Sequence, residues 1–187
     1  MRTGPGRQPD TPKEDVMKAL VVYESMFGNT AAIARAVAAG IGAHAEVTCT
    51  EVTTMPDTTD LDLIVVGGPT HAFGMSRPST RQDAARQGRT RSGTIEVGLR
   101  EWLDRCPSLA GMPATAFDTK IDKPFLPGSA GHTAARRLRR LNCRLVAPPE
   151  SFRVADTTGP LAAGETERAQ RWGEAVAKAV LAEQHLV

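Results

Sequence analysis

The sequence has few cysteines, few aromatic residues and no long apolar run. Its three cysteines, Cys49, Cys106 and Cys143, lie far apart and form no CxxC pair, which argues against a disulfide framework or a zinc site and for a reducing compartment. No apolar segment approaches the ~20 residues that a membrane-spanning helix needs, and the N-terminal residues include no hydrophobic signal core. These absences predict a cytoplasmic protein with no membrane span and no metal site.

The net charge is also small, since a formal charge of +2 over 187 residues gives no reason to expect nucleic acid as a partner. Basic residues nevertheless gather in two segments. Five arginines accompany one acid between Arg77 and Arg91, and seven basic residues accompany one acid between Lys120 and Arg144. A local positive field favours an anionic ligand or an acidic protein partner. The alternative interpretation is a solvated arginine-rich surface.

The order of apolar patterns along the chain indicates one α/β domain. Residues 1–16 are rich in glycine, proline and charge, which predicts a disordered tail before a domain at 17–187. Segment 74–93 has no clear period and is predicted to be a long loop or a short helix. Strand-length runs alternate with helical stripes, which predicts a parallel sheet of five strands with helices on both faces. The expected strands are 19–23, 45–52, 61–66, 113–117 and 143–154, and the expected helices are 30–41, 94–105, 130–141 and 165–183.

In an open parallel sheet, ligands bind beyond the carboxyl ends of the strands. The first strand is followed by Glu24–Thr30, with the sequence ESMFGNT, and then at once by a helix. Backbone N–H groups and the helix dipole at such a turn attract an anion, and Ser25, Asn29 and Thr30 add hydroxyl and amide donors. The turn has neither the lysine of GxxxxGK[ST] nor the spacing GxGxxG. It therefore predicts a site for a terminal phosphate and not for a pyrophosphate.

These motifs resemble those of the flavodoxin family. The segment YESMFGNT at 23–30 is similar to the family's phosphate loop, and GGPTHAFG at 67–74 is similar to the segment that flavodoxin-like oxidoreductases place along the isoalloxazine ring. A weaker similarity follows at 128–132, and the whole resemblance covers about residues 18–178. It implies a three-layer flavodoxin-like sandwich with strand order 2-1-3-4-5 and one non-covalently bound FMN. The residues it assigns to FMN are Ser25, Met26, Phe27, Gly28, Asn29, Thr30, Pro69, Thr70, His71, Ala72, Phe73, Gly74, Asp118, Thr119 and Lys120.

The sequence departs from the family in its aromatic residues. Flavodoxins commonly stack the flavin between aromatic rings, but the one tyrosine here, Tyr23, ends the first strand, and both tryptophans lie on helical core faces. The remaining candidates for stacking are His71 and Phe73 on the second loop, with Phe125 or His132 on the third. Lys120 or Lys123 is a candidate for the N1–C2=O edge of the ring, where a cation would stabilise the anionic reduced flavin.

The resemblance implies a redox protein that transfers electrons through FMN, so no protein side chain is expected to be catalytic. Its partner is expected to be a redox protein, NAD(P)H or a quinone. One alternative is an FMN-dependent NAD(P)H:quinone reductase or a porphyrinogen-type oxidoreductase of the same fold, which the basic surroundings and the few aromatic rings slightly favour. Another is a flavin-less interaction module. A phosphate-acceptor receiver domain is excluded, because its third strand would end in aspartate, whereas this one ends in Gly67.

Overall fold

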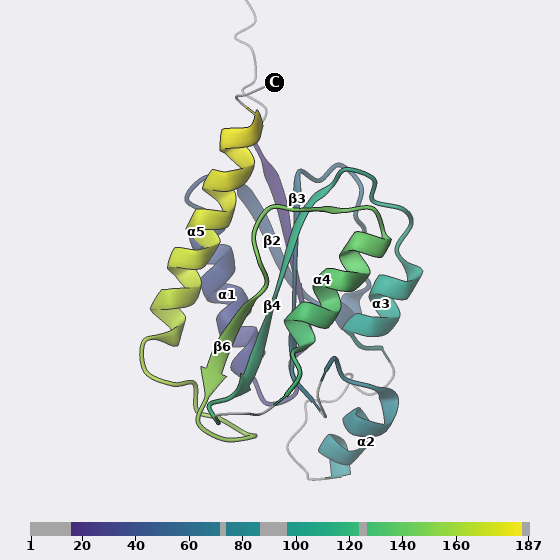
Figure 1. The fold of residues 1–187 in the computed structure, drawn as a ribbon, viewed down its shortest axis with the longest axis vertical. Helices are drawn as coiled ribbons and strands as arrows, with labels where there is room; N and C mark the ends of the chain where they lie inside the picture. The colour runs from purple at the N-terminus through teal and green to yellow at the C-terminus, as the bar shows by residue number, and fades with distance from the viewer. Residues whose placement is uncertain (1–15, 72–73, 87–96, 124–126, 185–187) are drawn as a thin grey trace, which may run out of the picture.

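A computed structural model describes residues 16–71, 74–86, 97–123 and 127–184 (Figure 1). These residues form one sheet in which all neighbouring strands run parallel, with the order β2-β1-β3-β4, and β5 and β6 follow one another along the outer edge of β4. The predicted order 2-1-3-4-5 is confirmed. The strands are β1 (Lys18–Tyr23), β2 (Glu46–Glu51), β3 (Leu63–Pro69), β4 (Pro113–Ile121), β5 (Arg144–Leu145) and β6 (Glu150–Val154).

Helices cover both faces of the sheet and make the three-layer sandwich (Figure 1). On one face, β-strand side chains such as Val21, Val65 and Phe152 pack with α1 and α5, and on the other face Val22 and Val66 pack with α3 and α4. Both faces of β1 and β3 are therefore buried, which explains their unbroken apolar sequences. The helices are α1 (Asn29–Ile41), α2 (Pro78–Arg86), α3 (Leu99–Arg105), α4 (Ala130–Arg140) and α5 (Glu165–Gln184), with a 3₁₀ turn at Val52–Thr54.

Three strand predictions were wrong at their ends, and the third strand, expected at 61–66, spans Leu63–Pro69. The fourth strand was expected to end at Phe117 but continues to Ile121, because Phe117–Ile121 pairs with β6 residue by residue. The expected fifth strand is divided into β5 and β6. Pro148 and Pro149 lie in the break, and neither has a backbone N–H for the sheet.

One helix prediction also needs revision, and one is made more specific. The helix expected to begin at residue 94 begins at Leu99, although residues 94–96 lie outside the described part of the chain. Its first-turn N–H groups are capped by carboxylates: Gly98 donates to Glu101 at 2.9 Å and Leu99 to Glu24 at 2.8 Å. In the segment predicted as a loop or short helix, Pro78–Arg86 forms the short helix α2.

The structure bears only in part on the predicted N-terminal tail and on the expected absence of a membrane span. Residues 1–15 of the predicted tail lie outside the described residues, and Val16 is exposed. Within the described ranges, no helix is both long enough and apolar enough to cross a bilayer.

Candidate functional site

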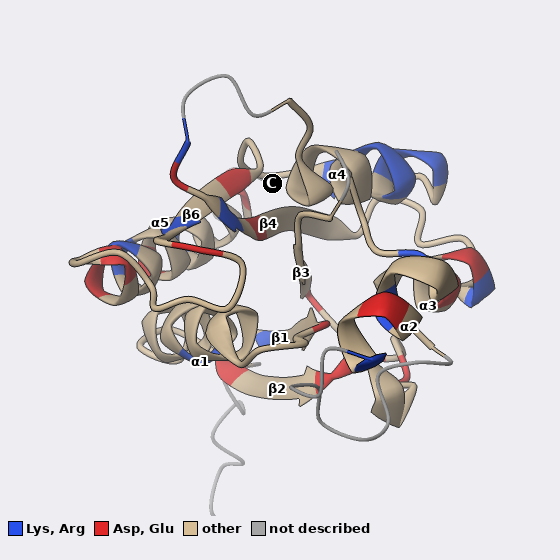
Figure 2. Cartoon of the chain, turned by 90° about the horizontal axis from the view of Figure 1, so that it is seen from below, with Lys and Arg blue, Asp and Glu red and all other residues tan. Residues whose placement is uncertain are grey.

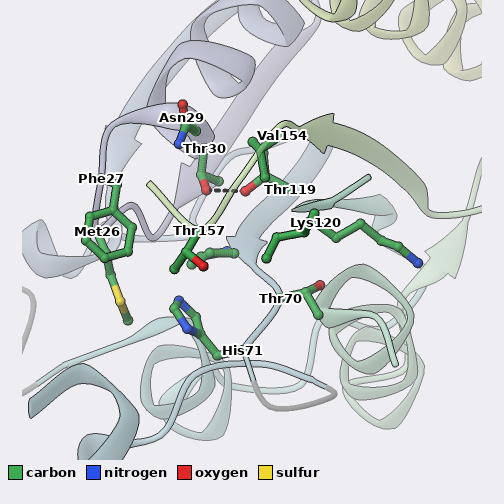
Figure 3. A pocket seen from close by; sticks show the side chains of 12 residues that line it. Met26, Phe27, Asn29, Thr30, Thr70, His71, Thr119, Lys120, Val154 and Thr157 are labelled. Carbon is green, nitrogen blue, oxygen red and sulfur yellow. Dashed lines mark hydrogen bonds between the residues drawn. The ribbon is translucent and has the colours of Figure 1, made fainter. Parts of the chain in front are cut away.

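A cleft lies at the carboxyl ends of β1, β3 and β4, where an open parallel sheet binds its ligands (Figure 3). Its walls come from the loop before α1, the segment after β3, the end of β4 and the loop after β6. The cleft therefore joins segments that lie more than 100 positions apart in the sequence. It is lined by Met26, Phe27, Asn29, Thr30, Pro69, Thr70, His71, Thr119, Lys120, Ile121, Val154 and Thr157.

The loop before α1 is shaped for an anion. Gly28 has φ of 91°, a left-handed conformation that glycine adopts without steric cost. The Ser25 hydroxyl accepts the N–H groups of Gly28 and Ala31, each at 3.2 Å, and so fixes the turn from behind. Backbone N–H groups in the first turn of a helix have no acceptor within the helix. Asn29 and Thr30 are the first two residues of α1 and line the cleft, so their N–H groups lie beside it. The first turn carries no acidic side chain that would repel an anion.

Hydroxyl groups join this loop to β4. Thr30 is buried, and its Oγ1 lies 2.8 Å from Thr119 Oγ1, across 89 residues of sequence (Figure 3). One of the two hydroxyls donates its hydrogen to the other, so the second hydroxyl can donate its own hydrogen to a ligand. The N-terminus of α1 and the end of β4 therefore present one continuous hydrogen-bonding wall.

Backbone hydrogen bonds hold Thr70, His71 and Gly74 in place after β3. Thr70 N donates to Thr119 O at 2.9 Å, and His71 and Gly74 exchange two backbone hydrogen bonds at 2.8 and 2.9 Å. The His71 ring lines the cleft, and its buried Nε2 has no hydrogen-bond partner among the described residues (Figure 3). Burial lowers the pKa of His71, because a low-dielectric environment disfavours the imidazolium. The cleft wall thus contains a buried imidazole nitrogen without a hydrogen-bond partner among the described residues.

Asp118 lies behind this wall, fully buried, and holds two segments together. Its Oδ2 accepts hydrogen bonds from Thr70 Oγ1 at 3.0 Å, Ser129 Oγ at 2.5 Å and Gly131 N at 2.9 Å. Asp118 therefore fixes the segment after β3 against the N-terminus of α4, and it does not line the cleft. We interpret it as a residue that positions Thr70.

A second buried network fixes the residues on either side of the cleft segments. The Glu24 carboxylate, which directly precedes the loop before α1, accepts hydrogen bonds from Ser76 Oγ and Leu99 N. Arg81 donates to Ser76 Oγ at 2.9 Å and pairs with Glu101 at 3.0 Å. Burial raises the pKa of Glu24, with the hydrogen bonds and Arg81 opposing this shift. The network links the end of β1 to α2 and α3.

This network corrects the prediction for the arginine-rich segment. Arg81 is one of the five arginines whose positive field was expected to favour an anionic ligand or an acidic protein partner, but its side chain is 1% exposed and bound to Ser76 and Glu101. Arg77 and Arg86 are exposed. Arg89 and Arg91 lie outside the described residues.

Most of the predicted cofactor residues meet at the cleft. Among the other predicted residues, Ser25, Gly28, Gly74 and Asp118 support its walls without lining it. Ala72 and Phe73 lie outside the described residues, as does the candidate Phe125. His132 and Lys123 are exposed and do not line the cleft. The predicted residues that line the cleft are Met26, Phe27, Asn29, Thr30, Pro69, Thr70, His71, Thr119 and Lys120.

Three lining residues were not predicted: Ile121, Val154 and Thr157. Ile121 was missed because the fourth strand was predicted to end too early. Val154 ends β6, and Thr157 follows it in a loop that approaches α1, since a Cβ at Gly159 would lie 2.6 Å from Asn29 Oδ1. The rule that ligands bind after the carboxyl ends of strands also applies to the last strand, and could have identified this loop.

The described residues give no sign of metal chemistry or reactive thiols. No group of three or more histidine, cysteine, aspartate or glutamate residues in the described ranges is arranged to hold an ion. Burial raises the pKa of Cys106 and of Cys143 to about 11, which keeps both thiols protonated at neutral pH. Cys143 is buried, while Cys49 and Cys106 are half-buried.

Several solved structures share this architecture at low sequence identity. A flavodoxin from the domain Archaea is 20% identical, with a TM-score of 0.60 over 88% of this chain and 99% of the other. Flavodoxin 1 from Bacillus cereus is 17% identical, with a TM-score of 0.62 over 86% and 97%. A flavodoxin described as WrbA-like, from Agrobacterium tumefaciens, is 17% identical, with a TM-score of 0.55 over 89% and 98%.

Sequence comparison alone finds less. No family model matches the sequence, and no curated protein matches it. The structural similarity therefore carries the assignment of the fold, and it extends over almost the whole length of the three proteins named above. The chain has a flavodoxin-like fold.

Proposed function

We propose that the cleft binds FMN and that the protein transfers electrons through this flavin. The observation that carries the proposal is the position of the α1 N-terminus, with its N–H groups and the Thr30 hydroxyl, beside His71 and Thr70 in one cleft. The flavodoxin-like fold of proteins named as flavodoxins supports the same ligand.

The donor set fits a flavin with a terminal phosphate. The N-terminus of a helix is a ready anion site, and the described cleft contains no acidic lining residue. The cleft has a volume of about 60 Å³, which suits the phosphate end of FMN. The isoalloxazine ring would lie along the segment that begins at Pro69. His71 Nε2, buried and without a partner among the described residues, supplies a polar group on that side.

The bound flavin would supply the redox chemistry, accepting and releasing electrons. The protein would supply binding and orientation. Ser25 keeps the anion-binding turn in shape, Asp118 holds Thr70 in position, and the Glu24 network fixes the segment that follows β3. Lys120, at the end of β4, would place a cation on the cleft wall.

The identity of the cofactor is the first test. The purified protein is expected to be yellow and to release stoichiometric FMN on denaturation, as identified by absorption and chromatography. Recovery of FAD instead would contradict the phosphate site, and a protein that binds no added FMN would indicate a flavin-less module.

A variant tests the location of the phosphate. Thr30→Ala removes one hydroxyl donor to a charged group, which is worth about 1.5–3 kcal/mol, so FMN affinity should fall by roughly one to two decades. Thr115→Ala is the matched control, because Thr115 is another buried threonine with a hydrogen-bonded hydroxyl. Its Oγ1 donates to the carbonyl oxygen of Ala147, which lies between β5 and β6. It should leave FMN affinity unchanged. Equal affinities in the two variants would place the phosphate elsewhere.

A further inference from the structure

A second concave surface lies between α4 and the chain that joins β5 to β6. It is a groove of about 690 Å³, within the range of small-ligand sites. One wall consists of basic side chains and Ala135 from α4, and the other consists of Leu145, Val146, Ala147, Pro148 and Pro149.

The basic wall presents charge that the protein does not neutralise. His132, Arg136 and Arg139 stand at positions i, i+4 and i+7 of α4 and so share one face. All three are exposed, and no carboxylate in the described ranges pairs with Arg136 or Arg139. By contrast, Arg137 pairs with Asp104 and Arg144 with Glu183. The sequence from 130 to 144 has five arginines and no acid.

The opposite wall is apolar and rigid. Residues 146–149 break the outer edge of the sheet between β5 and β6, and Val146 N still donates to Ala114 O at 3.0 Å. Two consecutive prolines restrict the backbone there. The segment therefore offers a fixed apolar surface opposite the arginines.

We propose that this groove binds a phosphorylated nucleotide of the pyridine dinucleotide class, NADH or NADPH. The arginines supply planar, bidentate donors for phosphate, and the apolar wall supplies a surface for a base. A bare anion would contact the arginines but not the apolar wall. An acidic protein would need the charge but not a concave site of this size.

The groove begins beside the candidate flavin cleft. His132 Nδ1 lies 3.0 Å from Ser129 Oγ, Ser129 Oγ donates to Asp118, and Asp118 accepts from Thr70, which lines the cleft. From His132 to Arg139 the helix rises roughly 10 Å. A ligand along α4 thus has one end at the arginines and the other near Thr70. Nucleotide binding goes beyond the proposed function and can be measured whether or not FMN is bound.

The test is calorimetric titration of the purified full chain with NADPH, with NADH and with inorganic pyrophosphate at low salt. The wild type is expected to bind a dinucleotide at least tenfold more tightly than pyrophosphate. The double variant Arg136→Gln/Arg139→Gln should weaken that binding by about two to four decades, since each charged hydrogen bond is worth about 1.5–3 kcal/mol. Arg140→Gln is the matched control, because Arg140 is exposed on the same helix but does not line the groove. It should remain within threefold of wild type.

Three results would overturn the proposal. They are no dinucleotide binding at millimolar concentration, equal affinity for pyrophosphate and dinucleotide, or equal dinucleotide affinity in the double variant and wild type. Binding of polyglutamate in place of the dinucleotide would instead assign the groove to an acidic protein. FMN affinity is measured in parallel for each variant. If FMN fails to bind while the dinucleotide binds, the proposed function fails and the groove proposal stands.

Discussion

His71 is an ionisable residue whose ring lines the cleft. Its Nε2 is buried without a partner among the described residues. Burial lowers the pKa of His71 below its ordinary value of about 6.5. Because the folded protein then binds fewer protons than the unfolded chain, this histidine stabilises the fold fully above pH 6.5. The contribution is lost as the pH falls from 6.5 toward the lowered pKa.

A comparison of wild type with His71→Gln tests this. The free energy of unfolding, measured by denaturant titration between pH 5 and pH 8 without added flavin, should fall more steeply with acidification in the wild type. The stability difference between the two proteins should be constant above about pH 7. A difference that stays constant down to pH 5 would mean that the imidazole is protonated freely in the folded state.

The site residues that sequence reasoning identified are those with local signals. Asn29 and Thr30 follow a strand and open a helix, and Pro69 to His71 follow another strand, so the rule for parallel sheets predicts their meeting. Asp118 was predicted as a cofactor residue, but its three hydrogen bonds place it behind Thr70. No sequence pattern distinguishes a polar residue that touches a ligand from one that holds its neighbour. Arg81 was misjudged for the same reason, because its partner Glu101 lies 20 positions away.

The pairing of α1 with α5 depends on two glycines. A Cβ at Gly40 would lie 2.0 Å from Gln170 O, and a Cβ at Gly173 would lie 2.3 Å from Val37 O. Both contacts are to backbone, which cannot move aside as a side chain can. The two helices therefore pack backbone against backbone, and α5 covers the same face of the sheet as α1.

Gly173→Ala is expected to lower the free energy of unfolding. Overpacking of this kind costs about 1–3 kcal/mol, which exceeds the gain of up to about 1 kcal/mol from replacing glycine by alanine inside a helix. Arg171→Ala is the control, since Arg171 is exposed on α5 two positions away. It should change stability by less than about 0.5 kcal/mol. Denaturant midpoints of the three proteins measure this, and an equally stable Gly173→Ala would show that the helices separate easily.

The elements themselves were largely predictable because their signals are local. Apolar runs such as Leu20–Val22 and Ile64–Val66 predict buried parallel strands, and the 3.6-residue stripe of Val176 and Val180 predicts a covering helix. The end of β4 was not predictable in this way. Residues 118–121 are polar or charged apart from Ile121, and they form a strand because β6 lies beside them. Pairing between distant segments decided that boundary.

At the scale of the whole molecule, and among the described residues, exposed positive charge without a carboxylate partner lies on α4 more than on α2. Figure 2, which looks toward the carboxyl ends of the strands, shows Lys and Arg along α4. On α2, Arg81 is buried and paired, and the exposed Arg86 lies 3.5 Å from Asp83. On α4, Arg136, Arg139 and Arg140 are exposed with no carboxylate partner in the described ranges. We therefore expect α4 to dominate the field that an approaching anion meets.

Oxidation of the reduced flavoprotein by ferricyanide, a small trivalent anion, tests this distribution in a stopped-flow experiment. The wild-type rate should fall as ionic strength rises, because exposed charges are screened over about 8–10 Å at physiological salt. Replacing Arg136, Arg139 and Arg140 by glutamine should lower the low-salt rate by about two- to tenfold and flatten the salt dependence.

The comparison variant carries Arg77→Gln, directly before α2, and Arg86→Gln, at the end of α2. Because Arg86 is already close to Asp83, this variant removes less uncompensated charge and should retain most of the salt dependence. Both variants should bind FMN as the wild type does, since none of the five arginines lines the cleft. If the α2 variant instead loses the salt dependence and the α4 variant keeps it, anions approach the flavin from the side of α2. The positive field would then belong to the segment that follows β3, as the sequence first suggested.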